Sequence, residues 1–175
     1  MKRVFALFLA LMMCLTFVSC TATDTPTKEV SNENTTNGIS QEENQEETFG
    51  LNETAVFNDL KFTASALEES NGEDYFEPEE GNTFVGVKFT IENISDKEQT
   101  VSSMLLFEGY ADDVKCSYSL NAAMAFGGAL DGSIAPGKKL IGYYSLEVPK
   151  DWHKLELDVQ SDWLSSNSAR FLFEK

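Results

Sequence analysis

The sequence predicts an all-β protein, an antiparallel β-sandwich that is preceded by a signal peptide and a disordered linker. Apolar and polar residues alternate in several short runs after residue 53, which is the period of half-buried strands. Turn residues, such as the Pro136-Gly137 pair, separate these runs. No stretch of this region combines a sustained helical period with capping residues. Many short strands without helices are typical of two packed antiparallel sheets.

The first 19 residues have the organisation of a secretion signal. A basic pair precedes the uncharged run Val4–Phe17, which is too short to cross a membrane as a helix. Ser19 then directly precedes Cys20, which resembles the bacterial lipobox, where the signal is cut before a cysteine that carries diacylglycerol. We therefore expect residues 1–19 to be a lipoprotein signal peptide and Cys20 to be lipidated. Ordinary secretion with cleavage near Ala22, or an uncleaved anchor, are the alternatives.

We expect residues 20–52 to form an acidic, flexible linker that is anchored by lipid at its start. Residues 21–52 contain seven acids and a single base, Lys28, and their only aromatic residue is Phe49. A segment with so few apolar residues cannot bury enough surface to fold by itself. Repulsion between the acids favours an extended chain.

Residues 53–175 predict one domain, because they contain nine of the 13 Phe, all five Tyr and both Trp. The clearest strand is 85–91, where Val85, Val87, Phe89 and Ile91 share one face. Asp112-Asp113 has the length of a hairpin turn, and Pro136-Gly137 suits a type II turn. The expected strands are 60–66, 85–91, 101–110, 114–120, 139–148, 154–159 and 169–174.

The charge and the few metal-binding or redox side chains exclude several classes of function. The chain has 13 Lys and Arg against 29 Asp and Glu, a net charge of −16, which argues against binding to nucleic acid or to anionic membranes by charge. It contains a single histidine, so most histidine-based metal sites are excluded. Once Cys14 leaves with the signal and Cys20 is alkylated, Cys116 is the remaining thiol, and an internal disulfide is impossible.

Three features of the sequence contain residue types that occur in catalytic or metal sites: the acidic loop, His153 and Cys116. The loop 68–80 carries seven acids, but they lack the regular spacing of a calcium loop. Paired catalytic carboxylates face each other across a cleft, which one loop cannot show, so a solvated loop is favoured. His153 is expected at a strand end on the surface. Cys116 shares its predicted strand face with Val114, Tyr118 and Leu120, and is expected to be a small buried hydrophobic residue. We expect no catalytic residue, metal or cofactor, and a protein that is not an enzyme.

One apolar stretch, 121–130, lies between two expected strands and gives the candidates for ligand binding, Met124 and Phe126. Either these side chains fold onto the end of the core, the favoured interpretation, or they form an exposed apolar loop that marks a partner site. Trp152 and Trp163 raise the same question, and both are expected in the core or at its rim.

Four segments, Gly81–Val87, Thr90–Glu98, Ile134–Lys139 and Leu146–Asp151, resemble a bacterial envelope family catalogued as domain of unknown function 4352. The resemblance implies a telokin-like, immunoglobulin-like β-sandwich that is common on lipoproteins. Its motifs are turn and strand signatures, so it implies a fold and carries over no functional residue.

The sequence therefore predicts a protein that is anchored at the extracytoplasmic face of a cell membrane through lipid on Cys20. Its domain is expected to bind an envelope protein or a small ligand without catalysis, and not nucleic acid. A passive structural or stress-related envelope component is the alternative, and a carbohydrate-active hydrolase is a distant one.

Overall fold

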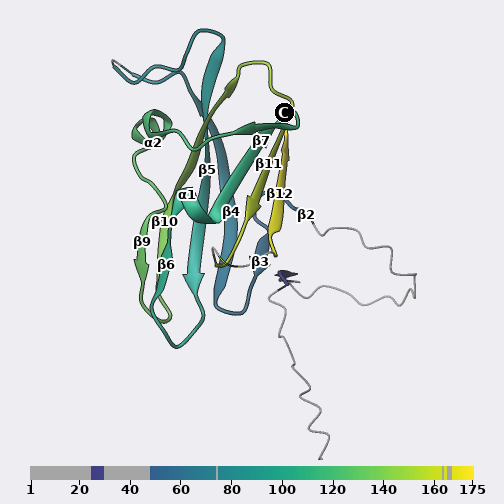
Figure 1. Cartoon of the computed structure of the whole chain (residues 1–175), viewed down its shortest axis with the longest axis vertical. Helices are drawn as coiled ribbons and strands as arrows, with labels where there is room; N and C mark the ends of the chain where they lie inside the picture. Colours follow the sequence, from purple (N-terminus) through teal and green to yellow (C-terminus); the bar gives the residue numbers. More distant parts are fainter. Residues whose placement is uncertain (1–24, 30–47, 74, 163, 165–166) are drawn as a thin grey trace, which may run out of the picture.

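The computed structural model describes residues 25–29, 48–73, 75–162, 164 and 167–175 (Figure 1). The predicted signal peptide 1–19, Cys20 and Trp163 lie outside the described residues. Within the described ranges, no helix has the length and apolar character needed to cross a membrane.

Two five-stranded sheets and a separate strand pair make up the domain (Figure 1). The first sheet has the order β1 (Thr27–Lys28), β3 (Thr54–Val56), β4 (Leu60–Ser70), β5 (Asn82–Asn93) and β10 (Lys139–Pro149). The second has the order β2 (Thr48–Phe49), β12 (Ala169–Glu174), β11 (Lys154–Val159), β7 (Phe107–Ala111) and β8 (Val114–Cys116). The pair consists of β6 (Gln99–Val101) and β9 (Gly132–Ile134). All described strand pairs are antiparallel except β2 with β12, so the predicted antiparallel β-sandwich is confirmed.

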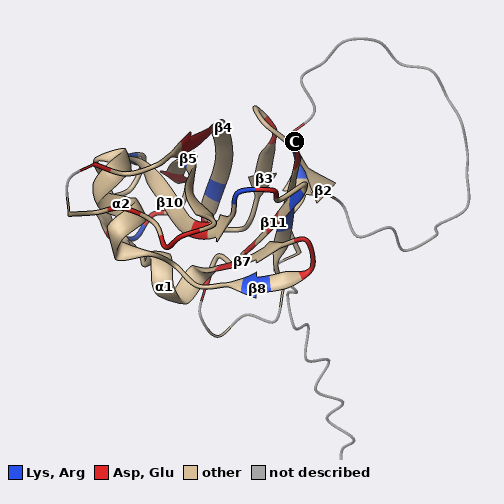
Figure 2. Cartoon of the chain, turned by 90° about the horizontal axis from the view of Figure 1, so that it is seen from above, with Lys and Arg blue, Asp and Glu red and all other residues tan. Residues whose placement is uncertain are grey.

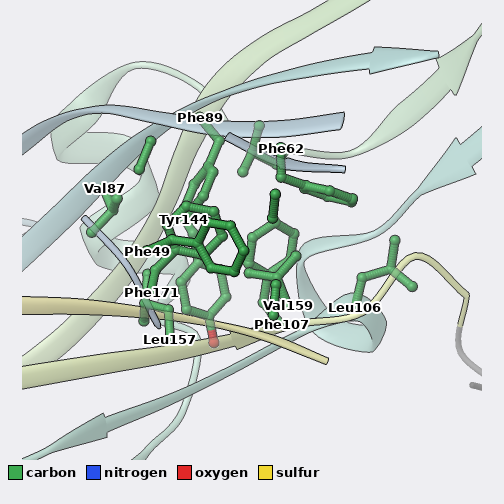
Figure 3. Close-up of a cluster of buried hydrophobic side chains, with 14 of the residues drawn as sticks. Phe49, Phe62, Val87, Phe89, Leu106, Phe107, Tyr144, Leu157, Val159 and Phe171 are labelled. Atoms are coloured by element: carbon green, nitrogen blue, oxygen red, sulfur yellow. The ribbon is translucent and has the colours of Figure 1, made fainter. Parts of the chain in front are cut away.

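The core fills the space between the two sheets and is rich in aromatic rings (Figure 3). The predicted inward face of β5 is confirmed, because Val85, Val87, Phe89 and Ile91 are all buried. The ring of Phe107, from the second sheet, lies 5.3 Å from Phe89 and 4.9 Å from Tyr144, both on the first sheet. Such aromatic pairs stabilise the contact between the sheets beyond the area that they bury.

The predicted turns have the expected backbone. Asp112 and Asp113 adopt positive φ angles, 47° and 67°, in the hairpin between β7 and β8. Gly137 has a φ of 69°, and the amide of Lys138 donates to the carbonyl of Ala135 at 3.0 Å, as a turn at Pro136-Gly137 requires.

The expectation that the domain has no helices is wrong. The predicted strand 101–110 contains a helix, α1 (Ser103–Leu106), and the predicted strand 114–120 ends after Cys116, before a second helix, α2 (Leu120–Phe126). Each helix begins at a side chain that accepts a hydrogen bond: that of Asp131, 28 residues away in the sequence, for α1, and that of Ser119 for α2. The carboxylate of Asp131 accepts hydrogen bonds from the amide and the hydroxyl of Ser103, at the first turn of α1.

The domain begins earlier than the predicted boundary at residue 53. The side chain of Phe49 is 1% exposed, and its ring lies 5.3 Å from that of Phe171. Strands β1 and β2 both come from the stretch 20–52 that was expected to be a flexible linker. The reason is that backbone pairing with a sheet that already exists costs far less than folding alone, so a polar segment with a single ring suffices.

Candidate functional site

Helix α2 covers the outer face of the first sheet, against β10, β5 and β4 (Figures 1 and 2). Its start is capped by Ser119, whose hydroxyl accepts a hydrogen bond from the amide of Ala122 at 3.2 Å. It ends at Gly127, which adopts the left-handed conformation with a φ of 74°. Ala122 and Ala123 are buried, so the helix lies close to the sheet.

The ring of Phe126 fixes the end of this helix on the sheet. It stacks on Tyr143 of β10, with ring centroids 5.4 Å apart and planes inclined by 22°. It also lies directly over Gly86 of β5, where a Cβ atom would stand only 2.7 Å from the ring. The sheet therefore accommodates this ring because residue 86 has no side chain, and Phe126 is half-buried.

Met124 points the other way. Its side chain is 67% exposed, and that of Leu120, four residues earlier on the same helix face, is 70% exposed. The structure thus separates the two candidate binding residues, since Phe126 packs on the outer face of the sheet and Met124 faces solvent.

Helix α1 adds a second exposed apolar pair. Met104 and Leu105 are 74% and 63% exposed, and α1 lies on the same side of the sandwich as α2 (Figure 2). The chain that follows α2 reaches α1, because the amide of Leu130 donates to the hydroxyl of Ser103. We call the four exposed side chains Met104, Leu105, Leu120 and Met124 the helical patch.

The sequence pattern does not single out three of these four residues, Met104, Leu105 and Leu120. The available signal was the spacing of Leu120 and Met124 between Ser119, a good cap, and Gly127, a good helix stop.

A polar cluster borders Phe126 on the same sheet face. The hydroxyl of Tyr143 donates to the Glu68 carboxylate at 2.7 Å, and this hydrogen bond raises the pKa of Tyr143. The ammonium group of Lys88 lies 5.6 Å from the centre of the Tyr143 ring. These contacts hold the ring on which Phe126 stacks, so they position α2.

The acidic loop forms an open hollow of about 390 Å³ at one end of the sandwich, beside Lys150. Glu68 and Glu69 belong to β4 instead of the loop. Within the described part of the chain, no three His, Cys, Asp or Glu side chains are grouped so that they could hold a metal ion.

His153 lies on the surface, as expected, with its side chain 83% exposed. The amide groups of Lys154 and His153 donate to the carboxylate of Asp112, and these hydrogen bonds lower the pKa of Asp112. Asp112 therefore joins the turn between β7 and β8 to the backbone at the start of β11.

The predicted buried face around Cys116 is correct only in part, because Cys116 and Tyr118 pack against the core whereas Val114 and Leu120 do not. Val114 is 67% exposed, and Leu120 lies on a helix. Strand β8 is a short edge strand, so one of its faces meets solvent. Cys116 itself is half-buried against the core, and burial raises the pKa of its thiol. Trp152, in contrast, is 1% exposed and belongs to the core.

Comparison with known proteins finds a family match and several similar folds. The family described as "Domain of unknown function (DUF4352)" matches residues 49–170. A search of curated proteins finds no match.

Among solved structures, an uncharacterized β-sandwich protein from Clostridium difficile 630 is 17% identical, with a TM-score of 0.53, over 78% of this chain and 100% of that chain. A Bacillus subtilis protein, YcdA, described as a candidate lipoprotein, is 17% identical with a TM-score of 0.54, over 67% of this chain and 37% of that chain. A conserved hypothetical protein from Bacillus anthracis is 13% identical with a TM-score of 0.52, over 70% and 94%. At these identities the likeness shows the fold alone.

Proposed function

Because the chain belongs to the DUF4352 family, whose name assigns no activity, we propose its function from its own sequence and surface. It is a lipid-anchored protein of the extracytoplasmic face of a cell membrane, and its sandwich domain binds an envelope protein or a small ligand without catalysis. The helical patch is the binding surface.

Membrane anchoring is supported by the first twenty residues. A basic pair, an apolar run and a small residue before Cys20 are the parts that a lipoprotein signal needs. Two acyl chains on one cysteine are enough for stable anchoring, whereas one chain gives weak binding. The description of the Bacillus subtilis relative as a candidate lipoprotein agrees with this proposal.

The single observation that supports binding is the exposure of the helical patch. Its four side chains, two Met and two Leu, are each more than 60% exposed on a chain with a net charge of −16. Large apolar side chains that are exposed on a charged surface are candidates for interaction sites. Methionine adapts its shape to a partner, and short helices on a rigid sheet present it in a fixed place.

Affinity capture tests this proposal. The mature chain, with Cys20→Ser to keep it soluble, is used as bait in an extract of the cell envelope. A Leu120→Ala, Met124→Ala double variant is expected to lose the captured partner, since truncation of an anchor residue costs about 1–3 kcal/mol of binding free energy. The matched control is Ile94→Ala with Ile141→Ala, which removes two exposed apolar side chains elsewhere on the domain.

Three results would count against this function. If the unaltered bait, the Leu120→Ala, Met124→Ala variant and the control variant capture the same amount of partner, the helical patch is not the binding surface. Capture of nothing, together with an envelope defect on deletion, would favour a passive structural role. Turnover of a carbohydrate that is abolished by changing one carboxylate would restore the hydrolase alternative.

A further inference from the structure

A short segment near the predicted anchor is docked on the domain. Residues 25–29 lie along the free edge of β3, where Thr27 pairs with Val56 and Lys28 pairs with Ala55. The amide of Glu29 donates to the carbonyl of Thr54 at 3.3 Å. The first sheet thus gains its outermost strand from the part of the chain that was expected to be linker (Figure 1).

Side chains select this segment through complementary charges. The ammonium group of Lys28 lies 2.6 Å from the carboxylate of Glu53 and 5.7 Å from the centre of the Phe49 ring. The adjacent Glu29 forms an ion pair with Lys61 of β4. The hydrogen bond from Lys28 lowers the pKa of Glu53, so Glu53 stays charged and keeps its partner at neutral pH. A Lys-Glu pair on the segment therefore matches a Glu and a Lys on the domain.

The docking is weak enough to be reversible. The partners of both ion pairs are between 27% and 52% exposed, and exposed ion pairs contribute little and are screened by salt. The paired strand is two residues long. Docking also closes a loop between residues 29 and 48, at a cost in chain entropy.

We propose that residues 25–29 form a latch that sets how far the domain reaches from the membrane. This inference rests on the proposed lipid anchor at Cys20. With the latch closed, about seven residues separate Cys20 from the sheet, and they span at most ~25 Å when extended. With the latch open, about 28 residues separate Cys20 from β2, and they span up to ~100 Å. Closing the latch holds the domain near the bilayer, and opening it releases the domain outward.

The first experiment tests the latch without lipid. Amide hydrogen exchange of Glu29 is measured by NMR in the mature chain with Cys20→Ser. Glu29→Lys and Lys61→Glu should each make this exchange about three- to tenfold faster, since each replaces an attraction by a repulsion. The double variant, which restores opposite charges, should recover the slow exchange, and high salt should accelerate the exchange of the unmodified pair.

Lys115→Glu is the matched control, because it breaks an ion pair with Glu108 between β8 and β7 of the second sheet, away from the latch. It should leave the exchange of Glu29 unchanged. Exchange of Glu29 at the rate of a free peptide, or a double variant as fast as the single ones, would overturn the proposal.

The second experiment measures reach on membranes. Lipidated protein in vesicles carries a fluorophore at the exposed position 114, introduced as Val114→Cys in a Cys116→Ser background, and energy transfer to an acceptor lipid reports the distance to the bilayer. Transfer should fall in Glu29→Lys and recover in the charge-swapped pair, and equal transfer in all variants would overturn the effect on reach. Mass spectrometry of the same samples tests the anchor separately. Absence of lipid on Cys20 would refute anchoring and the effect on reach, while the exchange data would still decide whether the segment docks.

Discussion

The contact between Phe126 and Gly86 allows a double-mutant test of how α2 is held. Phe126→Ala removes a half-buried ring and its stacking on Tyr143, so it should lower the free energy of unfolding by ~1–2 kcal/mol, below the 3–5 kcal/mol typical of a fully buried ring. Gly86→Ala places a Cβ atom 2.7 Å from that ring, and this crowding should cost ~1–3 kcal/mol.

In the double variant the ring that the new methyl group would meet is absent. The double variant should therefore be about as stable as Phe126→Ala alone, with a coupling of ~1–3 kcal/mol between the two positions. The free energies come from urea unfolding of the mature Cys20→Ser chain, followed by circular dichroism. Gly128→Ala is the matched control, since no atom lies within 4 Å of its Cβ position, and it should change stability little. Costs that add within ~0.5 kcal/mol would refute the contact.

Three further predictions concern the anchor, the start of the domain and the response to acid. Cys20→Ala should leave unprocessed precursor in cells, and mass spectrometry of the unaltered protein should find a diacylglyceryl group on that residue; an N-terminus at Thr23 without lipid would contradict this. Phe49→Ala should cost ~3–5 kcal/mol in urea unfolding because the ring is 1% exposed, while Leu51→Ala, 43% exposed, should cost far less; similar costs would mean that β2 is not part of the core. Asp112→Asn should reduce the loss of stability in acid: the folded-state pKa of Asp112 is lowered, so its contribution is present above about pH 4 and is lost as the pH falls through that lowered pKa. Unfolding curves measured between neutral pH and acid check this, and equal acid sensitivity of the variant would contradict it.

The alternation of apolar and polar residues predicts most of the strands, because this pattern depends only on residues that are neighbours in the sequence. The predicted range of β11, 154–159, is confirmed to the residue, and β5 shows the predicted inward face. Strands β1 and β2 could not be predicted this way, since two-residue strands contain no period and their pairing depends on residues far along the chain.

At the candidate site, too, neighbouring residues predict one part of the structure and distant residues decide the rest. The stretch 121–130 was identified from its apolar composition, but its local sequence did not separate Met124 from Phe126. What separates them is the missing side chain of Gly86, which lies 40 residues earlier in the chain and leaves room for one ring on the sheet. Helix α2, at seven residues, has too few turns for its period to stand out.

The pairing of β2 with β12 also constrains when the domain can fold. Phe49 pairs with Phe171, so the first strand of the second sheet meets its partner only when the last strand is available. During synthesis the N-terminal end emerges first, and until residue 171 emerges Phe49 lacks the strand beside which it is buried. Contacts between residues so distant in sequence form late and slow folding. For the export that we propose, this order of events would leave the second sheet incomplete until nearly the whole chain has passed.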